Sequence, residues 1–197
     1  MSATQSVILT REDAVKTQLD TAIWLWFIEE QIGPIHALAD NALTILNDIG
    51  GKVGKESQLY SKAMHEVHGR DRLKGFSNFL KHGSKDANAA YKFPLLWTEG
   101  LMLDAINLSA KIFPPVSLLM ATFTARTMCI HWAAGRLNRE EADKYTPKGV
   151  TLEEIAPLGR REFLETVLPL FAQRGLSSPD GLKSDRFVPS SALGDFI

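Results

Sequence analysis

Apolar residues recur at three- and four-residue intervals along most of this chain. Between residues 34 and 50 the apolar positions are Ile35, Leu38, Ala39, Ala42, Leu46 and Ile49. Such a stripe is typical of a helix that packs one face on a core. We find no alternating strand pattern, no heptad run and no internal repeat, so the pattern predicts an all-α protein.

Start and stop signals divide the chain into predicted helices. Thr10 is followed by Glu12 and Asp13, which are favourable acids in a first helical turn. Pro34 suits the first position of a helix, and Thr151 with Glu154 predicts a capping box. We predict helices over residues 11–30, 34–50, 57–68, 70–82, 94–113, 116–137 and 160–174, with a short one after Thr151.

The helix lengths and short connections predict a single-domain bundle of about five to seven helices, mostly antiparallel. The bundle is expected to span residues 1–174, with its shared core over about 11–137. Residues 175–197 are rich in Gly, Ser, Pro and Asp, which predicts an irregular C-terminal arm or tail.

The composition agrees with a globular protein. The 197 residues are 45% hydrophobic and 23% charged, with a net charge of −1, which excludes collagen-like and disulfide-rich classes. The single cysteine, Cys129, lies in an apolar stretch and predicts a buried side chain; it excludes cysteine-based zinc and iron–sulfur sites. Residues 1–10 lack a signal-peptide pattern, and the apolar runs are shorter than the ~20 residues of a membrane span. We therefore expect a soluble, cytoplasmic protein without a membrane partner.

Charge is distributed unevenly along the chain. Residues 62–92 contain seven basic and three acidic side chains, a balance of +4, so the remainder carries −5. Such a segment is a local basic patch or, alternatively, an anion-binding surface.

Three charged residues fall on apolar helix faces. Glu99 shares a face with Met102 and Ile106, and Arg126 shares one with Phe123. A buried charge requires a partner. We expect Arg126 to pair with Glu99 or, second, with Glu30, in a contact that fixes helix register rather than performing catalysis.

His36 and Asp40 lie four residues apart at the border of the second predicted helix. This spacing predicts a boundary salt link, and a metal site is the alternative. The sequence contains no Glu-x-x-His, His-Glu-x-x-His or Gly-x-Ser-x-Gly motif and no phosphate-binding glycine loop. We therefore expect no cofactor.

The segment Ser77-Asn78-Phe79-Leu80-Lys81-His82 separates apolar from polar positions. Phe76 and Leu80 belong to the predicted apolar face, whereas Asn78 and His82 lie roughly 150° away. At the end of a helix, the dipole favours the protonated form of His82.

This segment resembles the Arg-Asn-x-x-x-His signature of HEPN (higher eukaryotes and prokaryotes nucleotide-binding) domains. Many members are metal-independent ribonucleases of toxin and defence systems that act as symmetric dimers. The resemblance assigns Asn78 and His82 to the catalytic positions, and Ser77 stands where the family has its arginine. Arg72, Lys74 and Lys81 are the nearby basic candidates for binding RNA.

A second resemblance covers residues 20–113 or so. The segments Ala22-Ile-Trp-Leu-Trp-Phe27, Ile35-His-Ala-Leu-Ala39 and Asn78-Phe-Leu-Lys-His82 occur in that order. They are similar to a group of uncharacterised bacterial helical proteins, in which an acidic, proline-containing turn usually follows; here Gly83-Ser-Lys-Asp86 follows. This resemblance implies a shared bundle and no activity.

Three functions follow as expectations. The first is a non-catalytic regulatory or accessory protein that acts through protein–protein contacts as a homodimer, because Trp24 and Ile28 lie opposite the other apolar face of their helix. The second is a HEPN-like ribonuclease or RNA-binding protein that uses His82 and Asn78. The third is a small-molecule or metal site in which His36, Asp40 and Glu99 converge.

Overall fold

The computed structural model describes residues 9–28, 31–61, 64, 66, 70–81, 90–92 and 94–173. Within this part of the chain the secondary structure consists of eight α-helices and one short 3-10 helix, without strands. The predicted all-α class is confirmed. The predicted C-terminal arm lies outside the described residues.

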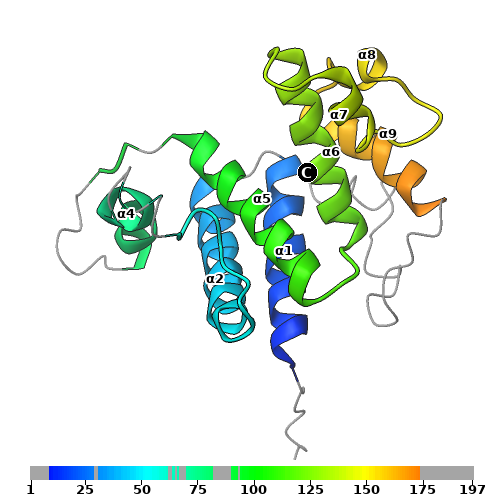
Figure 1. The fold of residues 1–197 in the computed structure, drawn as a ribbon. Helices are drawn as coiled ribbons and strands as arrows, with labels where there is room; N and C mark the ends of the chain where they lie inside the picture. Colours follow the sequence, from blue (N-terminus) through cyan, green and yellow to red (C-terminus); the bar gives the residue numbers. More distant parts are fainter. Residues whose placement is uncertain are drawn as a thin grey trace, which may run out of the picture. The chain divides into compact units, whose positions relative to one another are not determined.

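The chain divides into two compact units (Figure 1). The first unit comprises Met1–Ala22 and Ile32–Phe113, and the second comprises Ile23–Gln31 and Pro114–Ile197. Helix α1 (Arg11–Phe27) therefore contributes residues to both units. The single-domain arrangement expected from the sequence stays a prediction, and each unit is described by itself.

The first unit contains α2 (Ile32–Gly50), η1 (Gly51–Val53), α4 (Arg70–Lys81) and α5 (Leu95–Ile112). Helices α2 and α5 lie side by side and form its main packing (Figure 1). Four of the predicted apolar positions of α2 are buried, whereas Leu38 and Ile49 are half-buried, and α5 adds its own buried face. The buried apolar residues of the two helices are Ile35, Ala39, Ala42, Leu43, Leu46, Leu101, Met102, Ala105, Ile106 and Leu108.

Most helix boundaries agree with the sequence prediction. Helix α1 starts at Arg11, where Thr10 accepts from the Asp13 N–H and the Asp13 carboxylate accepts from the Thr10 N–H. Helix α2 starts at Ile32, two residues before the predicted Pro34, so the proline occupies the first turn, where its missing N–H has no helical partner to lose. Of the short helix predicted over 57–68, residues 57–61 form a turn rather than a helix, and residues 62, 63, 65, 67 and 68 lie outside the described residues.

Glycine is required at position 50 because a side chain there would clash with the following chain, and not because of its backbone angles. An added Cβ would lie 2.0 Å from the Lys55 carbonyl oxygen, although the φ of Gly50 is −60°. The neighbouring Gly51 has nothing within 4 Å of the same position. We expect Gly50→Ala to lower the free energy of unfolding by about 2 kcal/mol, because the chain after α2 must shift.

Gly51→Ala is the matched control for this prediction, and we expect it to change stability by less than about 0.5 kcal/mol. Urea denaturation followed by circular dichroism measures both variants. Equal stabilities of the two variants would show that the tight turn after α2 does not form as described.

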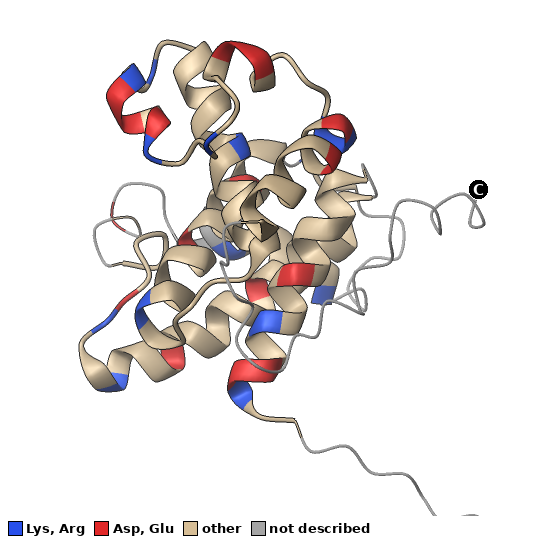
Figure 2. Ribbon diagram, turned by 90° about the vertical axis from the view of Figure 1, so that its right-hand side faces the viewer, with Lys and Arg blue, Asp and Glu red and all other residues tan. Residues whose placement is uncertain are grey.

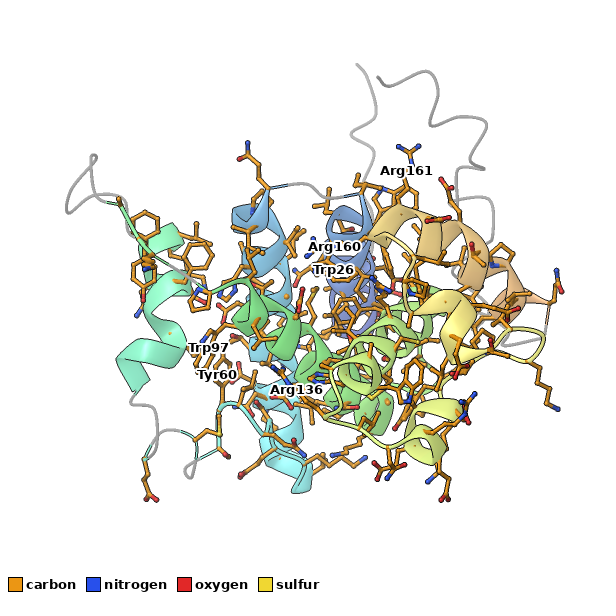
Figure 3. The ribbon with its side chains drawn as sticks, turned by 90° about the horizontal axis from the view of Figure 1, so that it is seen from above. Trp26, Tyr60, Trp97, Arg136, Arg160 and Arg161 are labelled. Carbon is orange, nitrogen blue, oxygen red and sulfur yellow. The ribbon has the colours of Figure 1, made fainter. Side chains whose placement is uncertain are left out.

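Aromatic side chains build the core of the second unit. Trp26 and Phe27, from the end of α1, pack edge-to-face with ring centroids 5.0 Å apart, and Phe123 lies 4.9 Å from Trp26. Phe163 stacks on Phe27. Figure 3 shows Arg160 beside Trp26, with its guanidinium 4.2 Å from the ring centroid. These rings lie on α1, on α6 (Leu118–Ala133) and on α9 (Arg160–Ala172).

Helix α6 ends four residues before the predicted Leu137 because a glycine stops it. Gly135 has a φ of +68°, and its N–H donates to the Trp132 carbonyl at 2.9 Å. The Arg136 N–H donates to the His131 carbonyl at 2.9 Å. This pair of bonds is the Schellman arrangement, in which a glycine in the left-handed region terminates a helix.

Two short helices lie between α6 and α9. The capping box predicted at Thr151 is confirmed at α8 (Leu152–Ile155), where Thr151 and Glu154 bond to each other's N–H groups. Helix α7 (Arg139–Asp143) lies between the helix predicted over 116–137 and the one predicted after Thr151, where the sequence predicts no helix. Asn138 caps it by accepting from the Glu141 N–H. The acidic first turns of both helices, red at the top of Figure 2, suit the positive ends of helix dipoles.

Among the described residues, no helix combines the length and the apolar character needed to cross a lipid bilayer.

Candidate functional site

His36 lies at the meeting point of three helices of the first unit. Its Nδ1 is 3.0 Å from the Thr98 hydroxyl on α5, and its Nε2 is 3.0 Å from the Ser77 hydroxyl on α4. The ring of Phe76 packs edge-to-face on the imidazole at 4.9 Å. Because only 1% of His36 is exposed, the imidazole ties α2 to α4 and α5 from inside the unit.

His36 is neutral at physiological pH. Burial lowers the pKa of His36 to about 4; the charge of Asp40 opposes this shift and that of Lys81 adds to it. In a neutral imidazole one nitrogen donates a hydrogen bond and the other accepts one. One hydroxyl therefore accepts from His36 and the other donates to it, so each ring nitrogen is satisfied by a helix neighbour.

Asp40 lies one turn beyond His36 on α2 and is fully buried. Its carboxylate accepts a short hydrogen bond from the Tyr60 hydroxyl and a 2.7 Å bond from Lys81 Nζ. Lys74 Nζ lies 3.8 Å from the same carboxylate. Burial alone would raise the pKa of Asp40, but the bonds from Lys81 and Tyr60 and the charge of Lys74 hold it below its ordinary value.

Tyr60, labelled in Figure 3, completes the contact between Asp40 and Lys74. Lys74 Nζ lies 3.9 Å from the centroid of the Tyr60 ring, which is a cation–π contact. Burial, with the negative charge of Asp40, raises the pKa of Tyr60 above its ordinary value. The phenol therefore keeps its proton and acts as a donor. We refer to His36, Asp40, Tyr60, Lys74, Ser77, Lys81 and Thr98 as the polar cluster.

Asp104 on α5 holds the chain segment that carries Tyr60. Its carboxylate accepts from the Ser57 hydroxyl at 2.5 Å, from the Gln58 N–H at 3.1 Å and from the Leu59 N–H at 3.0 Å. The Ser57 hydroxyl in turn accepts from the Tyr60 N–H. The Asp104 carboxylate on α5 thus satisfies the backbone N–H groups of this turn. These bonds fix the position of the turn, and so the position from which the Tyr60 side chain extends to Asp40.

The geometry of the polar cluster suits a structural role. Ser77 and the ring of His36 have the spacing of a nucleophile and a base, but both are buried. The His36 Nδ1 faces Thr98 rather than a carboxylate, so the orientation of a Ser-His-Asp triad is missing here. Within the described residues, no group of three or more His, Cys, Asp or Glu side chains could hold a metal ion.

Several residues singled out from the sequence meet in this cluster. His36 and Asp40 are buried rather than placed at a helix border, and each bonds to other elements, so the predicted boundary link is wrong. Lys74 and Lys81 lie at Asp40. The predicted convergence of His36, Asp40 and Glu99 on a metal is not found among the described residues; Glu99 is half-buried on α5.

The polar side of α4 is partly as predicted. Asn78 is exposed, whereas Ser77 is buried against His36. Leu80, predicted on the apolar face, is 37% exposed, whereas Phe76 on the same predicted face is buried. His82 and the side chain of Arg72 lie outside the described residues, so their predicted roles stay predictions.

Sequence reasoning missed Tyr60, Thr98 and Asp104 as site residues. Thr98 had a signal, because it lies four residues before Met102 and seven before Ala105 on the buried face of α5. Asp104 had a similar signal, because it lies three residues after Leu101 and four before Leu108 on the buried face of α5. Tyr60 had none, because it lies in a turn.

Arg126 in the second unit binds backbone carbonyls. Its Nη1 donates to the Ala156 carbonyl at 2.9 Å and approaches that of Ile155 at 3.5 Å, at the end of α8. Its guanidinium also lies 5.1 Å from the ring centroid of Phe163. The end of a helix carries partial negative charge, which suits a cation. Glu99 belongs to the first unit and Glu30 lies outside the described residues, so the ion pair predicted for Arg126 stays a prediction.

Cys129 is buried in the second unit, as predicted. Burial raises the pKa of its thiol to about 11, with the charge of Arg126 opposing the shift. The thiol therefore stays protonated at neutral pH, and it lacks the thiolate character of a nucleophile.

Comparison with protein-family models, with curated proteins and with solved structures found no match to this chain.

Proposed function

We propose that this protein is a cytoplasmic regulatory or accessory protein that acts through protein–protein contacts and forms a homodimer. One observation carries this proposal. Four large apolar side chains of the first unit are exposed around the end of α4 and the start of α5: Leu80 (37%), Tyr91 (41%), Leu95 (53%) and Leu96 (60%). We call these four residues the apolar surface. Where such side chains lie together in one exposed patch, they mark a site of protein association.

The polar cluster supports the same proposal because its contacts are explained by a structural role. Its hydrogen bonds join His36 and Asp40 of α2 to α4 and α5, an arrangement that accounts for these two buried polar groups without a chemical role. We therefore assign the apolar surface of the first unit to the contact with a partner. In a twofold dimer the same patch faces its own copy, and apolar side chains are compatible with such self-pairing.

The test replaces two leucines of the apolar surface. We expect the wild-type chain to sediment as a dimer, and the variant Leu95→Ser/Leu96→Ser to raise the dimer dissociation constant at least about tenfold, because two buried leucines would be lost from the interface. Analytical ultracentrifugation over a range of protein concentrations gives this constant. Val53, also in the first unit and 60% exposed, provides the control variant Val53→Ser, which should dimerise like the wild type.

A monomeric wild-type chain would contradict the homodimer. Equal dissociation constants for the leucine variant and the Val53→Ser control would place the interface elsewhere and remove the role of the apolar surface.

The alternative function is a HEPN-like, metal-independent ribonuclease or RNA-binding protein. The exposure of Asn78 favours it, because that function requires Asn78 to be accessible. The alternative predicts that the wild type cleaves RNA in the presence of a chelator and that His82→Ala abolishes cleavage without changing the thermal midpoint. Our proposal predicts no cleavage by the wild type.

A further inference from the structure

Helix α4 covers the buried polar groups of α2. The Ser77 hydroxyl on α4 lies 3.0 Å from His36 Nε2, and Lys81 Nζ lies 2.7 Å from the Asp40 carboxylate. His36 is 1% exposed and Asp40 is fully buried. The other nitrogen of the imidazole faces Thr98 on α5. Solvent therefore reaches His36 Nε2 only when α4 moves, whereas the contact with Thr98 does not involve α4.

The described part of α4 buries little apolar surface. Of the side chains that the structure describes on this helix, only Phe76 and Ser77 are buried, whereas Asn78, Leu80 and Lys81 are exposed. Helices α2 and α5, in contrast, pack on each other through buried apolar residues. Elements with few buried apolar contacts open at a lower free energy than the core to which they are attached.

An aromatic contact from outside the helix holds α4 in place. The ring centroid of Phe76 lies 4.9 Å from that of His36 and 5.8 Å from that of Tyr91, and Phe79 lies 5.5 Å from Tyr91. A Cβ added at Gly75 would clash with the Tyr91 hydroxyl, so the tyrosine rests directly on the backbone of α4. Because Tyr91 precedes α5 in the chain and is 41% exposed, this contact is open to solvent.

We propose that α4 is a lid over His36 and Asp40. In the open state α4 leaves α2, while α2 and α5 remain packed through their own apolar residues. The imidazole then loses Ser77 and keeps Thr98, and the carboxylate keeps the hydroxyl of Tyr60, which is not on α4. Opening gives water and solutes access to an imidazole and a carboxylate that lie four residues apart on one helix.

Carbethoxylation of His36 by diethyl pyrocarbonate measures the opening, because the reagent requires an accessible, unprotonated imidazole nitrogen. Peptide mass spectrometry of the whole chain at neutral pH gives the rate at His36, and its ratio to the rate of free imidazole is the opening constant. Hydrogen exchange of the Leu46 amide on α2 gives the constant for unfolding of the helix pair. We expect the constant at His36 to be at least about tenfold larger. Equal constants would show that His36 is reached only when the unit unfolds, and would overturn the proposal.

Two variants separate opening of the lid from unfolding of the unit. Ile106→Val removes a methyl group from the core of α5, which stays packed in the open state, so it should raise the constant at Leu46 about fivefold and leave that at His36 unchanged. Tyr91→Ala removes two aromatic contacts to α4 and should raise the constant at His36 about tenfold.

Tyr145→Ala is the matched control, because Tyr145 is a 45% exposed tyrosine of the second unit; His36 should react in it as in the wild type. Circular dichroism establishes that each variant is folded, and protein concentrations at which the chain is monomeric keep the result independent of the proposed dimer. An Ile106→Val variant in which both constants rise together, or a folded Tyr91→Ala variant that reacts no faster than the control, would overturn the lid.

Discussion

Replacing His36 with phenylalanine is expected to lower the free energy of unfolding by about 3 kcal/mol. The phenyl ring fills the space of the imidazole and keeps the contact with Phe76, but it has no nitrogen for Ser77 or Thr98. Each buried hydroxyl left without a partner costs ~1–3 kcal/mol. Urea denaturation at pH 7.5 measures the loss.

The triple variant His36→Phe/Ser77→Ala/Thr98→Val separates this cause from a change of ring shape. It removes the two hydroxyls together with the ring nitrogens, and replacing all partners of a buried hydrogen bond by apolar groups is nearly neutral. We expect the triple variant to recover at least half of the loss. If His36→Phe alone were as stable as the wild type, the hydrogen bonds of His36 would not be holding α4 and α5.

Acidification is expected to destabilise the protein through His36 by about 3 kcal/mol between pH 6.5 and pH 4. The pKa of His36 is about 4 in the folded chain and near 6.5 in the unfolded chain, so the unfolded chain binds more protons in this window. Stability therefore falls as the pH falls. The stability that the neutral His36 contributes is fully present above pH 6.5. It is lost as the pH falls to about 4 and stops changing below that pH.

The His36→Phe variant is the control for this pH dependence, because it lacks the titrating ring. Free energies of unfolding at half-unit pH intervals should show a shallower slope for the variant than for the wild type between pH 6.5 and 4. Asp40, whose pKa is held low, contributes its own loss only in more acidic solution. Parallel slopes of the two proteins would contradict the neutral, buried state of His36.

Local signals predicted the helices well. The capping box at Thr151, the acids after Thr10 and the stop at Gly50 each act within a few residues, so the sequence alone locates them. Helix α7 was missed because its five residues are too short to show periodicity, although the cap at Asn138 marks its start.

The site was predicted in part. The spacing of His36 and Asp40 singled them out, but one-dimensional pattern could not show that α4 and α5 bury them. Both residues lie next to apolar positions of α2. Whether residues at the border of an apolar face are exposed depends on the helices that pack against that face. Tyr60 reaches Asp40 from a turn 20 residues away. No helical periodicity predicts a contact of that kind, because Asp104 sets the position of the turn.

Arg126 illustrates the same limit for charge. Its place on an apolar helix face correctly indicated that it needs acceptors, and the sequence suggested carboxylates. The structure shows carbonyls at the end of α8 among its acceptors. Backbone acceptors carry no sequence signal, so a search restricted to acidic side chains overlooks them.

Nitrogen NMR of the imidazole of His36 tests most directly whether this residue is a buried, neutral link between three helices. We expect the His36 signals to report one fixed tautomer from pH 8 down to about pH 5, with protonation only near pH 4. A ring that titrates near pH 6.5, or that exchanges between tautomers at neutral pH, would contradict it.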